Sequence, residues 1–482
     1  MNTHVNAGPR LENIPVGKFH RRLALLVSLG MFFDSFDNTL SAGVLASMLD
    51  TGFSTLELNS LFLSVTFAGL AIGAAFAGWL GDRVGRSFAF QFSLALFGIL
   101  ALAAALAPSM EVLIALRGLM SIGMGAEYVI CYGMITEFIP PGRRGRFLGL
   151  LGIFAGLGVS LSSLLGWVVI PAVSWRGMFI IGGVGALIAW WMRRDMPESP
   201  QWLESRGRYE EAEAVIQRIA QESGVSGQEA AAPASAVDTT GDATDEKAEW
   251  VPITVLFSRA VIRRTLMALL LTVTCLFGSY AVTGWMPTFF VEQGMTVSKS
   301  LGFNAAIMSG YVAGPLLCMF IVDRLGRRRS LMMFGALSAV FAGLYPFMTA
   351  PALVIAVGFI LVATVASFLT LGLGTVPEYF PTAFRFRGGG LAQTAGRIGL
   401  IFSPFIVLWL FNSYGVFGVI LAVSGMYVIV TLLNAVAGVD TSREALDQIA
   451  PEGDTTDAPK DPKGPRSAHR ESDVTPGPSL SG

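Results

Sequence analysis

Apolar runs of about 20 residues recur along this chain, and they restrict its possible folds more than any other feature. A run of this length crosses the hydrocarbon core of a bilayer as an α-helix, because each residue advances the helix by about 1.5 Å. The sequence therefore predicts an all-α membrane protein with twelve transmembrane helices. We expect them at residues 23–45, 58–80, 88–107, 112–136, 147–169, 175–192, 265–288, 300–322, 330–349, 351–377, 388–411 and 414–437.

Composition supports the membrane class and argues against several functions. The chain is 53% hydrophobic and 14% charged, and its formal net charge of -1 offers no basic surface for nucleic acid. Three cysteines lie in apolar runs without CxxC spacing, so neither a disulfide framework nor a zinc site is indicated. We find no nucleophile–base pair, metal-ligand cluster or phosphate-binding glycine loop. We therefore expect no enzyme activity and no cofactor.

Arginines between the spans set the predicted orientation. Short loops assigned to the inside are rich in arginine, whereas the outside loops hold little beyond Arg176 and Lys299. Because Lys and Arg are retained on the cytoplasmic side, we expect both termini there, in a plasma (inner) membrane protein. The expected parts are a cytoplasmic N-terminus (1–22), two six-helix bundles (23–192 and 265–437), a cytoplasmic linker with a short helix (193–264) and a disordered tail (438–482).

An internal repeat relates the two bundles. The segment from Asp82 to Ser87 (DRVGRS) recurs from Asp323 to Arg328 (DRLGRR), shifted by 241 residues. Glu137, Pro140 and Arg144 recur with the same shift, as Glu378, Pro381 and Arg385. Two independent motifs with one shift indicate parallel repeats related by an axis along the membrane normal.

These motifs carry a resemblance to a known family. The segment 78–86 (GWLGDRVGR) resembles the loop signature of the major facilitator superfamily, and 197–203 (PESPQWL) resembles its sugar-porter and metabolite-symporter branches. The resemblance implies two bundles around a central cavity that opens to each side in turn. It also implies gating residues at the cytoplasmic helix ends, although positive charges there can merely fix topology. The gating candidates are Asp82, Arg86, Glu137, Arg144, Glu198, Asp323, Arg327, Glu378 and Arg385.

Charges inside the spans are the next signal, because each costs at least about 2.5 kcal/mol on insertion scales. Asp34 and Asp37 share one face of the first span, and Arg117 and Glu127 lie on the fourth. Counted from the inner ends of the helices, Asp34 and Glu127 lie at similar depths of about 14–16 Å. Counted from the outer ends, Asp37 and Arg117 lie at depths of about 8–12 Å. We therefore expect Asp37 and Arg117 to meet if the two helices are neighbours.

The segment that begins Phe36-Asp37-Asn38-Thr39 is similar to the proton site of sugar–proton symporters, and Arg117-Gly118 resembles their partner motif. The resemblance implies that Asp37 accepts the proton and that Arg117 tunes it. Asp34 and Glu127, as charges inside the same spans, complete the predicted proton-coupling group. Arg117 favours the ionised form of Asp37, so its movement would change the proton affinity. The alternative is a structural ion pair that only tethers two helices.

The remaining candidates concern the substrate. Arg397 in the eleventh span is a candidate anchor for an anion, because a guanidinium matches a carboxylate at two points. Tyr128, Tyr132, Trp285 and Phe289 are candidate substrate contacts, although aromatic residues in membrane proteins mostly pack or anchor. The fifth span has no amide side chain and the seventh no paired glutamine, so the resemblance to sugar porters fails where sugar hydroxyls would bind.

The sequence thus favours a secondary transporter, a monomer in the lipid bilayer, that couples protons to import of a small organic anion, aromatic or nicotinate-like. The alternatives are a transporter for sugars or other metabolites, a facilitator or an exporter. A further alternative of another class is a membrane sensor or scaffold that recruits partners through the linker and tail. The sequence leaves the substrate open.

Overall fold

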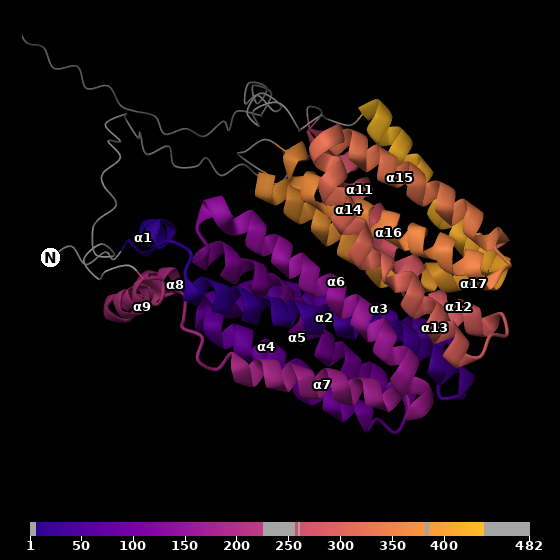
Figure 1. The fold of residues 1–482 in the computed structure, drawn as a ribbon, viewed down its shortest axis with the longest axis horizontal. Coiled ribbons are helices and arrows are strands. Elements are labelled where there is room, and N and C mark those ends of the chain that lie inside the picture. Colours follow the sequence, from indigo (N-terminus) through magenta and orange to yellow (C-terminus); the bar gives the residue numbers. More distant parts are fainter. Residues whose placement is uncertain (1–5, 225–255, 259–260, 381–384, 438–482) are drawn as a thin grey trace, which may run out of the picture.

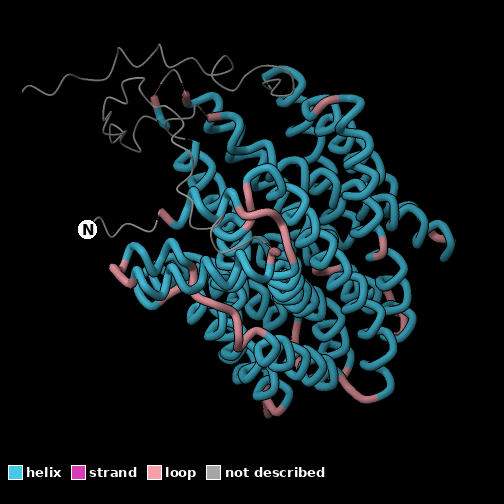
Figure 2. The backbone as a smooth tube through the Cα atoms, turned by 60° about the vertical axis from the view of Figure 1, so that its left-hand side comes forward, coloured by secondary structure: helices cyan, strands magenta, loops and turns pink. Residues whose placement is uncertain are grey.

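The computed structural model describes residues 6–224, 256–258, 261–380 and 385–437. Within these ranges the chain forms helices joined by short loops, and no strand is present (Figure 2). A helix satisfies its own backbone hydrogen bonds, which an apolar chain in lipid requires because no water is available there. Residues 225–255 and 259–260 of the expected cytoplasmic linker, and the expected tail at 438–482, lie outside the described residues.

Six long helices form the N-terminal half and coincide with the first six predicted spans. They are α2 (Lys18–Asp50), α3 (Leu56–Val84), α4 (Arg86–Ala105), α5 (Met110–Phe138), α6 (Pro141–Ala172) and α7 (Trp175–Met192). Several continue beyond the predicted limits because polar residues at helix ends can stay helical outside the bilayer core.

The C-terminal half follows the same plan. Its elements are α11 (Ile262–Thr283), α12 (Met286–Glu292), α13 (Val297–Met308), α14 (Gly310–Leu325), α15 (Arg327–Leu344), η2 (Tyr345–Phe347), α16 (Pro351–Thr375), η3 (Val376–Tyr379) and α17 (Arg385–Ala437). The eighth predicted span is divided at Ser309, and α14 also contains Pro315.

The described residues include 11 helices that are long and apolar enough to cross a membrane. The last of these spans 49 residues, which exceeds what one crossing needs. It breaks at Gly415, whose φ of 65° and ψ of -166° are not helical. Gly415 is the repeat counterpart of Ser174, which separates α6 from α7. The two parts of α17 are therefore the eleventh and twelfth spans, as predicted.

The repeat extends to the packing of individual helices. A β-carbon built on Gly73 of α3 would lie 2.0 Å from the carbonyl oxygen of Ile122 on α5. The residues 241 positions later repeat this approach, since a β-carbon on Gly314 would lie 2.0 Å from the carbonyl oxygen of Ala363. Glycine at both positions lets two helix backbones come into contact. The sequence repeat is therefore also a structural one.

The two halves lie side by side, and a cap covers one end of the first (Figure 1). Helix α2 meets α12 and α13, α3 meets α17, and α6 meets α13 and α14. Hydrogen bonds cross this interface from Asn38 to the hydroxyl of Tyr280, at 2.7 Å, and from Ser64 to the carbonyl of Ile401. The cap consists of α1 (Ala7–Asn13), α8 (Pro200–Ser205) and α9 (Tyr209–Glu222).

Candidate functional site

The structure brings Asp37 of α2 and Arg117 of α5 together in an ion pair that is fully buried. Arg117 also donates to Thr66 Oγ1 at 3.2 Å and to Ser41 Oγ at 3.1 Å. Its guanidinium lies 5.3 Å from the ring centroid of Phe62. Arg117 is thus held on several sides, as a buried charge must be to offset its lost hydration.

A second buried ion pair joins Glu127 of α5 to Arg193, the residue that ends α7. The two side chains approach to 2.6 Å, and Ser93 donates to the other Glu127 oxygen at 2.7 Å. Arg193 also donates to the carbonyl of Leu26 and lies 3.8 Å from the ring centroid of Phe90. The pair therefore connects α2, α4, α5 and α7.

The sequence places Arg193 at the start of the expected cytoplasmic linker (193–264), so it was not among the predicted buried charges. One signal was available in Gly30, which lies one turn before Asp34 on α2. A β-carbon on Gly30 would lie 2.0 Å from Arg193 Nη2 and 2.1 Å from Glu127 Oε1. Glycine at this position of α2 therefore leaves the space that the side chains of Arg193 and Glu127 occupy.

Asp34 differs from the other two carboxylates. Within the described part of the chain it makes no hydrogen bond or ion pair, and its Oδ1 is buried. The charges that act on it are those of Asp37, Glu127, Arg117 and Arg397. Asp34 therefore lies on α2 between the two ion pairs, and the positive charge of Arg397 from the C-terminal half also acts on it.

Aromatic side chains from both halves surround this region. Tyr128 and Tyr132 of α5 lie with ring centroids 5.1 Å apart, and the Arg397 guanidinium is 5.9 Å from the Tyr128 ring. Arg397 also donates to the carbonyl of Leu70 at 3.4 Å, so α17 reaches across to α3. Tyr280, which sequence reasoning did not single out, receives the hydrogen bond from Asn38 on α2. The halves thus share a tyrosine-lined region with one guanidinium.

The two other aromatic candidates are placed differently. Trp285 and Phe289 stack with centroids 6.0 Å apart, and Phe289 stacks on Phe411 at 5.2 Å. Both are almost fully buried. Trp285 lines a small cavity with Phe67 and Tyr280, so it borders the tyrosine-lined region, whereas Phe289 packs within the C-terminal half.

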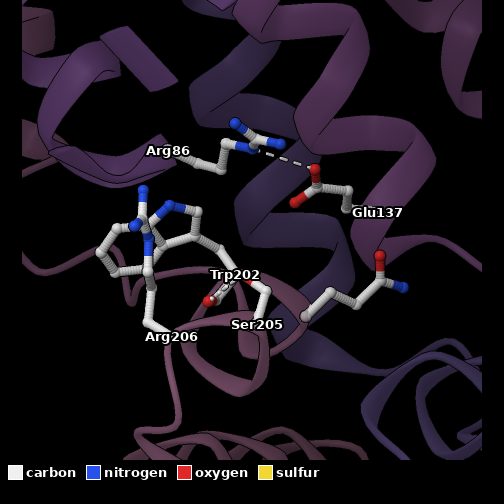
Figure 3. A pocket seen from close by; sticks show the side chains of 6 residues that line it. Arg86, Glu137, Trp202, Ser205 and Arg206 are labelled. Atoms are coloured by element: carbon white, nitrogen blue, oxygen red, sulfur yellow. Dashed lines mark hydrogen bonds and ion pairs between the residues drawn. The ribbon is translucent and has the colours of Figure 1, made fainter. Parts of the chain in front are cut away.

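At the capped end, Arg86 of α4 donates to Glu137 of α5 at 3.1 Å (Figure 3). Glu198 accepts the backbone N–H groups of Arg86 and Ser87, at 2.7 and 3.1 Å, and so caps the start of α4. Gly85, with φ of 121°, leaves room for it, since a β-carbon there would lie 2.3 Å from Glu198 Oε2. A cavity of about 350 Å³ beside this network is lined by Arg86, Glu137, Gln201, Trp202, Ser205 and Arg206 (Figure 3).

The other gating candidates are only partly described. Arg144 pairs with Glu12 at 3.3 Å and donates to the carbonyl of Ile139, so its partner is in the N-terminal segment and not in the neighbouring loop network. Arg327 is exposed at the start of α15. The side chains of Asp82, Asp323, Glu378 and Arg385 lie outside the described residues.

Comparisons with known proteins agree with this architecture. Residues 24–452 match the family model described as sugar (and other) transporter. The chain is 31% identical to the inner membrane metabolite transport protein YdjE of Escherichia coli, over 93% of this chain and 99% of the relative. It is 30% identical to the niacin transporter NiaP of Acinetobacter baylyi, over 91% and 98%.

Among solved structures, the inward-open xylose transporter XylE of Escherichia coli superimposes with a TM-score of 0.70. The match covers 89% of this chain and 99% of that one at 18% sequence identity, so it supports the fold alone. These matches are to multi-pass membrane transporters of small molecules, not to enzymes. The chain therefore belongs to the sugar (and other) transporter family within the major facilitator superfamily.

Proposed function

We propose that this chain is a proton-coupled symporter that imports a small organic anion, aromatic or nicotinate-like. The observation that carries the proposal is the tyrosine-lined region between the halves. There the guanidinium of Arg397 lies 5.9 Å from the Tyr128 ring and within the field of the unpartnered Asp34. A guanidinium binds a carboxylate through two parallel hydrogen bonds, and tyrosine rings stack on an aromatic ring.

The names of several relatives support an acid as substrate. Similar proteins include the niacin transporter NiaP, a cis,cis-muconate transport protein and a gallate transporter. All three named compounds are carboxylic acids or their anions. Sugar transport is the second candidate, favoured by the xylose–proton symporter fold, but α6 and α11 contain no glutamine or asparagine for sugar hydroxyls.

Alternating access supplies the transport cycle. The hydrogen bonds between the halves, such as Asn38–Tyr280 and Ser64–Ile401, connect helices away from the cap. The capped end carries the arginine-rich loops, so we place it in the cytoplasm together with both termini. The Arg86–Glu137–Glu198 network then forms a cytoplasmic gate within the N-terminal half. We further propose a monomer in the inner membrane.

Coupling requires that proton and anion bias the same conformational equilibrium. The group proposed to do so is Asp34, Asp37, Arg117 and Glu127, with Arg397, Tyr128, Tyr132 and Trp285 around the anion. Phe289 would then support the Trp285 ring from behind, since it stacks on it.

Transport by purified full-length protein in proteoliposomes tests the proposal. An inward proton gradient should drive accumulation of labelled nicotinate, gallate or cis,cis-muconate, and adding the anion should alkalinise the outside medium. Uptake of the anion without proton movement would indicate a facilitator. Movement of protons in the direction opposite to the anion would indicate an exporter. Failure to transport any acid, with transport of a sugar, would overturn the proposal. Failure to transport either would favour the sensor or scaffold.

Arg397 gives a more specific prediction. Arg397→Gln should weaken anion binding by about 10- to 100-fold, because a hydrogen bond to a charged group contributes about 1.5–3 kcal/mol. Arg397→Lys should recover only part of the affinity, since an ammonium cannot make the two-point contact. Isothermal titration of the purified variants measures both values. Equal affinity in Arg397→Gln and the unaltered protein would remove Arg397 from the anion site.

A further inference from the structure

The three carboxylates deep in the N-terminal half differ in what surrounds them. Asp37 is paired with Arg117, and Glu127 with Arg193. Asp34 has neither a cationic partner nor a hydrogen-bond donor among the described residues, and its Oδ1 is buried. The difference decides what a proton would do at each position.

Protonation of Asp37 would leave Arg117 as an uncompensated charge, fully buried beside Phe62, Thr66 and Ser41. Protonation of Glu127 would do the same to Arg193, which is also fully buried. A buried charge that loses its partner is strongly unfavourable. Protonation of Asp34 instead removes a buried charge that has no partner, so the proton enters most easily there.

The groups that face Asp34 from each packed helix are consistent with this choice. Beyond Asp37 on its own helix, α5 contributes Arg117, Glu127, Tyr128, Cys131 and Tyr132, α11 contributes Tyr280, and α17 contributes Arg397. The membrane part of α6, from residue 147 to 172, contains no ionisable residue, and the arginine at the end of α7 is already bound to Glu127. Arg397 is thus the cation left to share between Asp34 and a bound anion.

The net charge of this region bears on how many protons accompany each anion. The three carboxylates are matched by the three guanidiniums of Arg117, Arg193 and Arg397, so the region is neutral when all are ionised. An anion that binds Arg397 adds one negative charge in a poorly hydrated site, where charge is expensive. One proton restores neutrality. The proton and a monovalent anion would therefore enter together.

We propose that Asp34, and not Asp37, carries the transported proton. The inference rests on the proposed symport of an organic anion and differs from the resemblance to sugar symporters, which points to Asp37. In the outward-facing state Asp34 takes a proton from water, and the anion binds the guanidinium of Arg397. The neutral acid can then donate a hydrogen bond to the anion. In the inward-facing state the anion leaves, and Asp34 returns the proton to the cytoplasm.

Proton uptake on anion binding tests this proposal without the need for transport. Nicotinate, gallate and cis,cis-muconate are titrated into purified full-length protein, and the acid that binds is the probe. Titration in buffers of different ionisation enthalpy gives the protons taken up for each anion bound. At alkaline pH, where Asp34 of the free protein is ionised, the unaltered protein should take up about one proton for each monovalent anion bound, and its Kd should then increase by up to about tenfold for each unit of pH increase.

Three variants distinguish Asp34 from Asp37 as the carrier of the transported proton. Asp34→Asn should bind the anion without proton uptake and with a Kd that is independent of pH, and Asp34→Glu should restore both. Asp37→Asn/Arg117→Gln, which removes an ion pair without leaving a charge, should keep proton uptake although transport slows. Thermal unfolding confirms that each variant is folded before titration.

Proton uptake that persists in Asp34→Asn and disappears in Asp37→Asn/Arg117→Gln would overturn the inference while leaving the symport proposal intact. Anion binding without proton uptake in the unaltered protein at alkaline pH would also overturn it. Failure of all three acids to bind would instead count against the proposed function, and the inference would fall with it.

Discussion

The N- and C-terminal halves share their helix packing but not their chemistry. A shift of 241 residues superimposes the glycine contacts of α3 with α5 on those of α14 with α16. The same shift turns the buried ionisable residues into small, apolar or neutral ones. Asp34, Asp37, Arg117, Glu127 and Arg193 correspond to Cys275, Gly278, Gly358, Phe368 and Asn434.

Packing closes the space that charges occupy in the first half. A β-carbon on Gly278, the counterpart of Asp37, would lie 2.7 Å from the hydroxyl of Tyr427. Tyr427 also contacts the ring of Phe368, the counterpart of Glu127, at a centroid distance of 5.2 Å. The two halves therefore share a scaffold, but the N-terminal half holds these buried charges and the C-terminal half presents Arg397 and tyrosines to them. In the proposed symport cycle, one half is therefore enough to hold the proton site.

Breaking either ion pair of the N-terminal half should have the largest effect. Asp37→Asn and Glu127→Gln each leave a fully buried arginine without its partner, which should cost about 3–5 kcal/mol of unfolding free energy. The double variant Glu127→Gln/Arg193→Gln should recover most of that loss. Asp34→Asn is the matched control, because it removes a carboxylate that has no partner, and it should keep its thermal unfolding temperature. Single variants as stable as the control would mean that the pairs do not hold these helices together.

The ion pairs belong to the N-terminal half, whereas the close glycine contacts occur in both halves. Substitution of these glycines should therefore destabilise the two halves equally. Gly73→Ala and Gly314→Ala each place a methyl group 2.0 Å from a carbonyl oxygen of the neighbouring helix, so each should cost about 1–3 kcal/mol through overpacking. Gly133→Ala and Gly374→Ala are controls that are also 241 residues apart, and nothing lies within 4 Å of their β-carbons. Those two should be neutral or slightly stabilising. Unequal losses for Gly73 and Gly314, measured by thermal unfolding, would show that the packing is less symmetric than the contacts.

Sequence reasoning reached the fold because each span is a continuous apolar run and the repeat is exact in its shift. It also brought Asp37 near Arg117, since depth along two oppositely directed helices follows from residue counting. It did not reach the Glu127–Arg193 pair or the solitary position of Asp34. Those depend on where the last turn of α7 points and on how Gly30 lets two side chains cross α2, and neither is encoded in periodicity.

The smallest expected effect concerns the cap, which in the described structure covers the N-terminal half. Glu204 accepts the backbone N–H groups of Asn6 and Ala7 at 2.9 Å, and Arg10 pairs with Glu213, so α1 docks on α8 and α9. The hydrogen bond from Arg10 lowers the pKa of Glu213 below its usual value. The folded carboxylate therefore releases its proton more readily than the unfolded one, so the stabilisation is present at neutral pH. It is lost as pH falls through the folded-state pKa.

Arg10→Ala should consequently loosen α1 at neutral pH by no more than about 1 kcal/mol, because the pair is partly exposed. Hydrogen exchange of residues 6–13, followed by mass spectrometry, should then be faster than in the unaltered protein at neutral pH and no different at acidic pH. Arg218→Ala, which removes the exposed pair with Glu222 on the same helix as Glu213, is the matched control and should leave exchange in α1 unchanged. Equal acceleration in both variants would mean that α9 as a whole, and not the Arg10–Glu213 contact, holds the cap on the charged half.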